Sequence, residues 1–245
     1  MKKLGLIGSS LKHSFSKSYF KKKFLDLNIK NFRYDLYEIS KIEKVINILK
    51  DKSIVGLNVT IPYKQDIIKY LHEIKGDAQN IKTVNTIKII NGYCIGYNTD
   101  ILGFKNSLKE YIGSKKINAI VLGNGGASQA IQFALKSINI KYVIVSRNFN
   151  KKIISYNELN NDVLNEYKLI INTTSLGMYP YNNTYPKIPY NLLTNKHYLY
   201  DLVYNPTKTL FLQKGEKMGS KIINGFEMLK KQADLSWEIW QNNFF

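Results

Sequence analysis

The sequence predicts an α/β protein of two domains, each with a mainly parallel sheet. Apolar runs of strand length alternate with helical patterns through the first hundred residues, which favours parallel strands joined by helices. Near the middle of the chain an apolar run, residues 119–122, ends in a glycine-rich turn, residues 123–126, ahead of an alanine-rich helical pattern. That order is typical of a Rossmann-like dinucleotide-binding unit, in which glycines let the backbone approach a pyrophosphate. Because such a unit usually opens a domain, the residues before it are expected to form another.

The first domain is expected to begin with three strand and helix pairs. This alternation predicts right-handed crossovers between parallel strands. An Asn91-Gly92 pair then predicts a hairpin, and a helix over residues 100–111 leads into the second domain. The expected strands are residues 4–7, 34–39, 55–61, 84–90 and 93–97, and the expected helices are residues 18–27, 42–49 and 65–74.

The second domain repeats the alternation. A segment with three of the five prolines, residues 179–189, is expected to be a loop. The last stretch has apolar residues near one face of a helix and predicts an amphipathic closing helix. The expected strands are residues 117–122, 142–145, 168–172, 198–203 and 221–223, and the expected helices are residues 128–137 and 226–241.

Charge and composition exclude several classes of function. The formal net charge of +18 would suit nucleic-acid binding, but the lysines are scattered and only Arg33 and Arg147 are arginines. We therefore expect no nucleic-acid partner, and a field that attracts anionic ligands. Cys94 is the only cysteine, which indicates a reducing cytoplasm. We expect no metal site and no membrane span, since metal-ligand clusters and long apolar stretches are missing.

The residues after the second strand of the nucleotide-binding domain favour NADP over NAD. NAD-binding units usually carry an acidic residue at this place, which binds the ribose hydroxyls. Here the strand leads into Ser146, Arg147 and Asn148, with Lys151 close behind. A cation at this place suits the 2′-phosphate of NADP. The alternative is that Arg147 caps a surface turn.

Two serines near the start of the first helix are candidates for binding a carboxylate. Ser14 and Ser16 lie just ahead of the predicted helix, where hydroxyls and the helix dipole favour an anion. Taken alone, Ser16 is better explained as the helix N-cap.

Lys64 and Asp100 are candidates for acid-base chemistry. Lys64 follows a buried-looking strand at the predicted start of a helix, where the dipole disfavours a cation and lowers a lysine pKa. Asp100 begins the helix after the hairpin. If the two meet, they form a cation-carboxylate pair able to pass a proton. The alternatives are a surface lysine and a helix-capping aspartate.

Together the motifs resemble the shikimate dehydrogenase family over nearly the whole chain and in the same order. Any one of these motifs could arise by chance, but nine in order are highly specific. They are HSFSKSYF (residues 13–20), NVTIPYK (58–64), VNT (84–86), YNTD (97–100), LGNGGAS (122–128), SRN (146–148), NTTSLGM (172–178), DLVYNPTKT (201–209) and NGFEMLKKQ (224–232).

The resemblance implies an oxidoreductase of aromatic amino-acid biosynthesis by the chorismate pathway. Its reaction would be the reversible, NADPH-dependent reduction of 3-dehydroshikimate to shikimate, in a cleft between the domains. Residues 1–100 and 226–245 would form the substrate domain, to which the last helix returns, and residues 101–225 the NADP domain. Protonated Lys64 would stabilise the developing alkoxide and supply a proton, while Asp100 orients the lysine and the substrate.

The resemblance also implies the residues around each ligand. The substrate carboxylate would be held by Ser14 and Ser16, and Tyr204 would close over it. The ring hydroxyls and the carbonyl would be surrounded by Thr60, Lys64, Asn85, Asp100 and Gln232. The pyrophosphate would lie on Gly123, Gly125, Gly126 and Ala127; the 2′-phosphate on Ser146, Arg147, Asn148 and Lys151; and the nicotinamide along Thr174, Ser175, Leu202 and Gly225.

Two departures from the family pattern bear on these expectations. Lys17 stands where the family usually has proline, so the loop before the first helix loses a residue that stiffens helix entry. The family's Asn-Arg-Thr at the 2′-phosphate is Ser146-Arg147-Asn148 here, which keeps the arginine. Alternatives are a relative that oxidises quinate or uses NAD, and a non-catalytic basic descendant. A monomer or a homodimer is expected.

Overall fold

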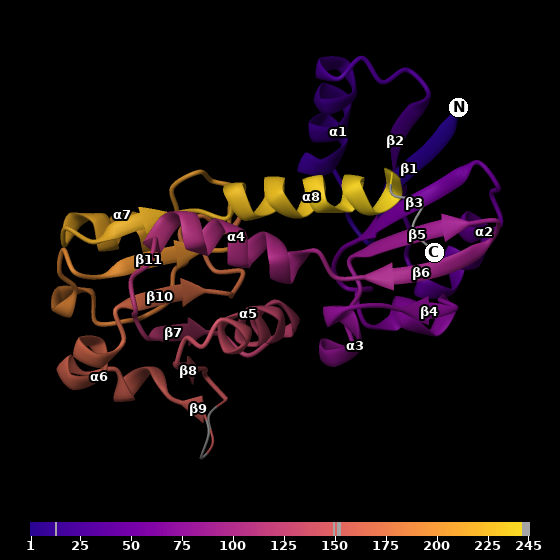
Figure 1. The fold of residues 1–245 in the computed structure, drawn as a ribbon. Helices are drawn as coiled ribbons and strands as arrows, with labels where there is room; N and C mark the ends of the chain where they lie inside the picture. Colours follow the sequence, from indigo (N-terminus) through magenta and orange to yellow (C-terminus); the bar gives the residue numbers. More distant parts are fainter. Residues whose placement is uncertain (13, 149, 151–152, 242–245) are drawn as a thin grey trace. The chain divides into compact units, whose positions relative to one another are not determined.

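A computed structural model describes residues 1–12, 14–148, 150 and 153–241 (Figure 1). The chain forms two compact units, one of residues 1–99 with the chain from Ala233 onward, and one of residues 100–232. Each unit is built on a six-stranded sheet. The predicted α/β class with two domains is therefore confirmed. His13 and Lys151 lie outside the described residues.

The sheet of the first unit has the order β2-β1-β3-β5-β6-β4. Three pairs, β1 with β2, β1 with β3 and β4 with β6, are parallel, whereas β5 is antiparallel to β3 and β6. The predicted hairpin joins β5 to β6, and Asn91 and Gly92 both have positive φ, 50° and 84°, as a type I′ turn requires. The strands are β1 Lys2–Gly8, β2 Phe32–Glu38, β3 Ile54–Val59, β4 Glu73–Ile74, β5 Thr86–Ile90 and β6 Tyr93–Tyr97.

Helices cover both faces of this sheet. On one face α1 and the end of α8 enclose a core that includes Leu4, Phe20 and Trp240. Gly56 allows this packing, because a Cβ there would lie 2.4 Å from the Trp240 ring. The other face packs Ile7 and neighbouring apolar residues under α2 and the turn after β3. The helices are α1 Phe15–Asp26, α2 Val45–Leu49 and α3 Asp77–Ile81, with a 3₁₀ turn over Ile42–Lys44.

The helix predicted over residues 65–74 is wrong. That segment is a 3₁₀ turn, Asp66–Tyr70, followed by the short strand β4. The backbone N–H groups of His72 and Lys75 donate to Cys94 and Gly96 of β6, at 2.9 and 2.8 Å. Apolar residues with helical spacing thus lie partly in a 3₁₀ turn and partly in an extended segment, whose backbone pairs with β6.

The sheet of the second unit is parallel throughout, with the order β12-β11-β10-β7-β8-β9. The chain leaves β7 to form β8 on one side and later returns to form β10 on the other. This reversal creates a switch point at the carboxyl end of β7, where open α/β sheets bind ligands. The strands are β7 Ala119–Leu122, β8 Tyr142–Val145, β9 Ile153–Ile154, β10 Leu169–Asn172, β11 Tyr198–Asp201 and β12 Lys221–Ile223.

The helices of the second unit also lie on both faces of its sheet. On one face α4 packs against α5, and Phe104 of α4 contacts Tyr200 of β11 with ring centroids 5.1 Å apart. On the other face Leu164 of α6 and Phe211 of α7 join the strand residues in one core. Neither α6 nor α7 was expected from the sequence. The helices are α4 Asp100–Ile112, α5 Gly126–Ser137, α6 Asn161–Glu166 and α7 Leu210–Lys217.

The closing helix, α8 Phe226–Gln241, has the predicted bounds and passes from the second unit to the first. Its first two turns pack on α4: a Cβ at Gly103 would lie 3.0 Å from Gln232, and Lys231 pairs with Glu110 at 2.6 Å. The second unit ends at Gln232, whereas the predicted NADP domain ends at residue 225. The first boundary falls after Thr99. The ligands assigned to the two domains stay a prediction.

Within residues 1–241, apart from 13, 149, 151 and 152, no three acidic, histidine or cysteine side chains are grouped so that they could bind a metal ion. In that same part of the chain, every helix is too short or too polar to cross a bilayer.

Candidate active site

Ser14, and not Ser16, is the N-cap of α1. Its hydroxyl accepts a hydrogen bond from the Ser16 N–H at 3.3 Å, and the helix begins at Phe15. The expectation that Ser16 caps the helix is wrong, because the helix starts earlier than the apolar spacing indicated. Capping therefore does not occupy the Ser16 hydroxyl. Both serines are half-buried in the first turn of α1.

Tyr34 of β2 makes a buried hydrogen bond that the sequence did not predict. Its hydroxyl donates to Asn58 Oδ1 at 2.8 Å. Burial raises the pKa of Tyr34. Tyr34 is therefore a neutral hydroxyl bonded to the Asn58 side chain.

Thr60, Lys64 and Asn85 lie in the first unit where β3 ends and β5 begins. The Thr60 N–H donates to the Ile7 carbonyl at 2.9 Å, and the Lys64 carbonyl accepts from the Val84 N–H at 2.8 Å. The second bond places the Lys64 backbone beside the segment that holds Asn85. Residues distant in the predicted order are thus brought together at the carboxyl ends of β1 and β3.

The prediction that Lys64 lies at the start of a helix is wrong. Lys64 lies in a turn that leads into five residues of 3₁₀ helix, and no α-helix starts there. Lys64 stays a candidate for the acid-base residue because it is half-buried beside Asn85 and belongs to the NVTIPYK motif.

Asn85 is 3% exposed and is tied to the residue before Asp100. Its Nδ2 donates to Thr99 Oγ1 at 3.0 Å, and its Oδ1 accepts from the Thr99 N–H at 2.7 Å. These two bonds hold Thr99, the residue just before α4. Asp100 is the first residue of α4.

Asp100, Tyr204 and Gln232 belong to the second unit. Gln232 is 8% exposed, and its Nε2 donates to the Leu229 carbonyl at 3.0 Å. Tyr204 is half-buried just beyond β11, and burial raises its pKa. The pairing of Asp100 with Lys64 stays a prediction, because these two residues belong to different units.

The glycine turn after β7 has the shape that a pyrophosphate requires. Gly123 has φ of +104°, and a Cβ there would lie 2.9 Å from Thr174. Gly125 is the N-cap of the twelve-residue α5, and around Gly125 and Gly126 a Cβ would meet open space. The first N–H groups of α5 have no partner within the helix. A helix N-terminus of this kind can receive an anion, and Ala127 lies in the same first turn.

The other predicted cofactor residues follow the carboxyl ends of neighbouring strands. Ser146 follows β8, Thr174 and Ser175 follow β10, Leu202 follows β11, and Gly225 follows β12. Gly225 is required by close approach, because a Cβ there would lie 2.2 Å from the Leu202 carbonyl oxygen. Strand order thus gathers residues far apart in sequence at one edge of the sheet.

A buried carboxylate supports this edge and was not predicted as a site residue. Asp201 is fully buried; its Oδ1 accepts from Asn172 Nδ2 at 2.9 Å and the Val203 N–H at 3.0 Å, and its Oδ2 from Thr209 Oγ1 at 2.6 Å. Asn172 Oδ1 in turn accepts from the Thr174 hydroxyl at 2.6 Å. The sequence carried a signal for this pair, because Asn172 and Asp201 belong to the NTTSLGM and DLVYNPTKT motifs and each is the last residue of its strand.

Arg147 and Asn148 are exposed beyond β8. The Asn148 N–H donates to Ser146 Oγ at 3.3 Å, so these residues form a tight turn. Burial raises the pKa of Tyr156, and the charge of Arg147 opposes this shift. The Arg147 side chain is open to solvent. Lys151, predicted for the same phosphate, lies outside the described residues.

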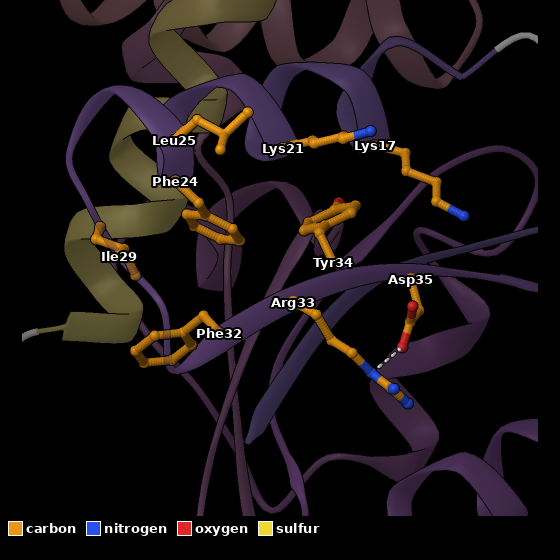
Figure 2. A pocket seen from close by; sticks show the side chains of 9 residues that line it. All are labelled: Lys17, Lys21, Phe24, Leu25, Ile29, Phe32, Arg33, Tyr34 and Asp35. Atoms are coloured by element: carbon orange, nitrogen blue, oxygen red, sulfur yellow. Dashed lines mark ion pairs between the residues drawn. The ribbon is translucent and has the colours of Figure 1, made fainter.

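Two hollows lie away from the predicted site. One, of about 370 Å³, lies between α1 and β2 in the first unit (Figure 2). The other, of about 640 Å³, is formed in the second unit by the ends of α4 and α5 and the segments that follow them. None of the described residues predicted to bind substrate or cofactor lines either hollow. The first is lined by Lys17, Lys21, Phe24, Leu25, Ile29, Phe32, Arg33, Tyr34 and Asp35.

Comparison with known proteins finds relatives over nearly the whole chain. Residues 6–87 match a family model described as the shikimate dehydrogenase substrate binding domain. A shikimate dehydrogenase (NADP⁺) of Methanococcus vannielii is 40% identical over 259 residues, covering 97% of this chain and 90% of the relative. A crystal structure of a shikimate dehydrogenase with NADP⁺ has a TM-score of 0.89 at 35% identity and covers 98% of this chain and 90% of its own. Shikimate 5-dehydrogenase from Thermus thermophilus, with NADP(H) and shikimate, gives 0.87 at 27% identity and covers 98% and 94%.

Proposed function

This chain belongs to the shikimate dehydrogenase family, and we propose that it catalyses the reversible reduction of 3-dehydroshikimate to shikimate with NADPH. The observation that carries the proposal is 40% identity to a shikimate dehydrogenase (NADP⁺) across 97% of the chain. The open glycine cradle at α5, beside four other strand ends that carry matched residues, supports it.

The residues matched to the substrate site would bind the substrate and transfer a proton to it. NADPH, when bound, supplies the hydride. The Lys64 ammonium stabilises negative charge on the carbonyl oxygen and delivers a proton to it, and Asp100 orients Lys64 and a ring hydroxyl. Ser14 and Ser16 hold the carboxylate, with Tyr204 over it, while Thr60, Asn85 and Gln232 hydrogen-bond the ring hydroxyls.

The residues of the second unit would hold the cofactor. The N–H groups at the start of α5 bind the pyrophosphate, and Arg147 pairs with the 2′-phosphate in the turn made by Ser146 and Asn148. Thr174, Ser175, Leu202 and Gly225 border the nicotinamide. A solvent-exposed arginine at this turn supports a preference for NADP.

The test is a spectrophotometric assay of cofactor reduction at 340 nm. Purified protein is incubated with shikimate or quinate, each paired with NADP⁺ or NAD⁺, and folding is checked by circular dichroism. We expect turnover with shikimate and NADP⁺ and a lower kcat/KM in the other three combinations. A well-folded protein without turnover on shikimate and NADP⁺ would refute the proposal.

The same four reactions separate the competing functions. Faster turnover of quinate with NAD⁺ would identify the chain as a quinate-oxidising relative. Binding of shikimate in calorimetry without turnover would identify a non-catalytic descendant. The half-buried Ser14 and Ser16 and the exposed Arg147 favour the first proposal over both, because they supply groups for a carboxylate and for a phosphate.

A further inference from the structure

We propose that Ser236 of α8 is a positioning residue for the substrate, which acts by holding the side chain of Asn85 through buried hydroxyl groups. This proposal rests on the proposed function, since it takes Asn85 as a ligand of a ring hydroxyl. Ser236 lies outside the nine matched motifs, so the resemblance gives it no role. All the residues that carry the proposal belong to the first unit.

Three hydroxyl groups lie within hydrogen-bond distance of one another inside the first unit. They belong to Thr86, the first residue of β5, to Thr99, which follows β6, and to Ser236, and we call them the hydroxyl triangle. The Ser236 oxygen lies 2.8 Å from that of Thr86 and 3.2 Å from that of Thr99, and the two threonine oxygens are 3.2 Å apart. Thr86 and Ser236 are fully buried, and Thr99 is 3% exposed. The triangle therefore joins α8 to β5 and to the residue just before α4.

The hydroxyl triangle holds the Asn85 side chain at both of its polar atoms. Asn85 Oδ1 accepts from the Thr99 N–H at 2.7 Å, and because a backbone N–H can only donate, this bond fixes which amide atom is the oxygen. Oδ1 also accepts from the Thr86 hydroxyl at 3.2 Å, and Nδ2 donates to Thr99 Oγ1 at 3.0 Å. Two members of the triangle thus hold one orientation of the amide.

Asn58 of β3 holds the backbone of the same residue. Asn58 Nδ2 donates to the Asn85 carbonyl at 3.2 Å, to Thr86 Oγ1 at 3.1 Å and to Ser236 Oγ at 3.0 Å. Its Oδ1 accepts from the Tyr34 hydroxyl at 2.8 Å, so the orientation of this amide is also fixed. The predicted ligand is therefore held by its main chain and by its side chain.

Ser236 closes a ring of hydrogen bonds that begins and ends at Asn85. One order of donors satisfies the ring: Asn85 Nδ2 donates to Thr99, Thr99 to Ser236, Ser236 to Thr86, and Thr86 to Asn85 Oδ1. Neighbouring bonds in such a ring strengthen one another in a buried site. Without the Ser236 hydroxyl, both threonines lose this partner and the amide of Asn85 is held less firmly. An amide that is already oriented reduces the ordering cost of binding substrate.

The first test compares Ser236→Ala with Ser107→Ala. Alanine removes one hydroxyl and suits a helix. We expect Ser236→Ala to raise the KM for shikimate, and its Kd by calorimetry, about three- to tenfold, which corresponds to one hydrogen bond. The KM for NADP⁺ should stay unchanged. Ser107 is the matched control, because it is a buried serine of α4 whose hydroxyl lies 2.8 Å from that of Tyr200. Ser107→Ala should leave both KM values at the wild-type level.

A double-mutant cycle with Asn85→Ala tests whether Ser236 acts through Asn85. If it does, Ser236→Ala should change the Kd of shikimate by less than about twofold in the Asn85→Ala background, because the group that it positions is gone. A merely structural role would raise the Kd by the same factor in both backgrounds.

Hydrogen exchange measured by NMR tests the same contact without any ligand. The Thr99 N–H is bonded to Asn85 Oδ1, so looser holding of Asn85 should expose it more often. Relative to the amide of Leu57, a fully buried residue of β3, the Thr99 amide should exchange about tenfold faster in Ser236→Ala than in the wild type. In Ser107→Ala this ratio should not change.

Four outcomes would overturn the proposal. They are wild-type shikimate binding in Ser236→Ala, an equal rise in both backgrounds, parallel rises in the KM values of shikimate and NADP⁺, and an unchanged exchange ratio for Thr99. Wild-type protein that binds no shikimate would count against the proposed function, and the exchange of Thr99 would still decide whether Ser236 positions Asn85.

Discussion

Lys64 is the residue on which the proposed chemistry depends most directly. It lies in the turn after β3, and its carbonyl is bonded to the Val84 N–H next to Asn85. In the proposed mechanism the ammonium of this half-buried residue faces a carbonyl oxygen of the substrate. The turn, and not a helix dipole, positions it.

The first prediction is that Lys64→Ala lowers kcat by about 10²–10⁴-fold, the usual contribution of a positioned proton donor. Binding of NADPH, measured by fluorescence titration, should stay within about twofold of wild type, since the cofactor residues are assigned to the other unit. Lys69→Ala is the matched control, because Lys69 is an exposed lysine of the adjacent 3₁₀ turn. A near wild-type rate for Lys64→Ala would remove this residue from the mechanism.

At the scale of elements, Asp201 joins three segments of the second unit. Its carboxylate contacts the end of β10 through Asn172, the end of β11 through Val203, and the N-cap of α7 through Thr209. Burial raises its pKa to about 6, more than the hydrogen bonds from Thr209, Val203 and Asn172 lower it. The protonation of this one buried acid therefore links the arrangement of these three segments, at the predicted cofactor edge of the sheet, to pH.

The second prediction concerns this link between Asp201 and pH. In the unfolded chain an aspartate titrates near 3.8, below the folded value of about 6. Between these values the native protein binds the extra proton, so the unfolding free energy falls as pH rises from about 4 to about 6. In the wild type this decrease in unfolding free energy amounts to at most about 3 kcal/mol. In Asp201→Asn the decrease should be absent.

Urea denaturation at pH 4, 5, 6 and 7 measures the difference between wild type and Asp201→Asn. Asp162, which is exposed in the first turn of α6, provides the control. The unfolding free energy of Asp162→Asn should change with pH as steeply as that of the wild type. If Asp201→Asn also keeps that slope, Asp201 does not titrate in this range and the link between pH and the cofactor edge is wrong.

Most elements could be predicted because their signal is local. The hairpin at Asn91-Gly92, strand β8 and helix α8 follow from turn chemistry and periodicity within one segment. Residues 65–74 could not be predicted, because their apolar spacing suits a helix and only β6, more than twenty residues later, makes them extended. The short helices α6 and α7 depend in the same way on the core they complete.

At the scale of the whole molecule, the dominant feature is the formal net charge of +18. Shikimate carries a carboxylate and NADP carries phosphates, so both ligands are attracted over distances comparable with the Debye length. That length falls from about 30 Å at 0.01 M ionic strength to about 3 Å at 1 M. The charge that first suggested nucleic acid thus fits capture of small anions.

The third prediction is that kcat/KM for shikimate falls as sodium chloride rises from about 0.01 to about 0.5 M, while kcat at saturation stays nearly constant. The reason is that screening acts on the approach of the ligand and not on chemistry in the bound state. Initial rates at subsaturating and saturating shikimate measure the two quantities. A kcat/KM independent of salt would show that the net charge plays no part in capture.

The sequence by itself determined the fold class, the order of most strands and helices, and the motifs that identify the family. These are local properties, since a strand, a turn or a glycine cradle is encoded by consecutive residues. Only the tertiary structure decided that Tyr34 bonds Asn58 and that Asp201 supports Thr174 through Asn172. The bonds from Tyr34 to Asn58 and from Asn172 to Asp201 join residues 24 and 29 positions apart, and no periodicity encodes which buried polar group will satisfy another across a sheet.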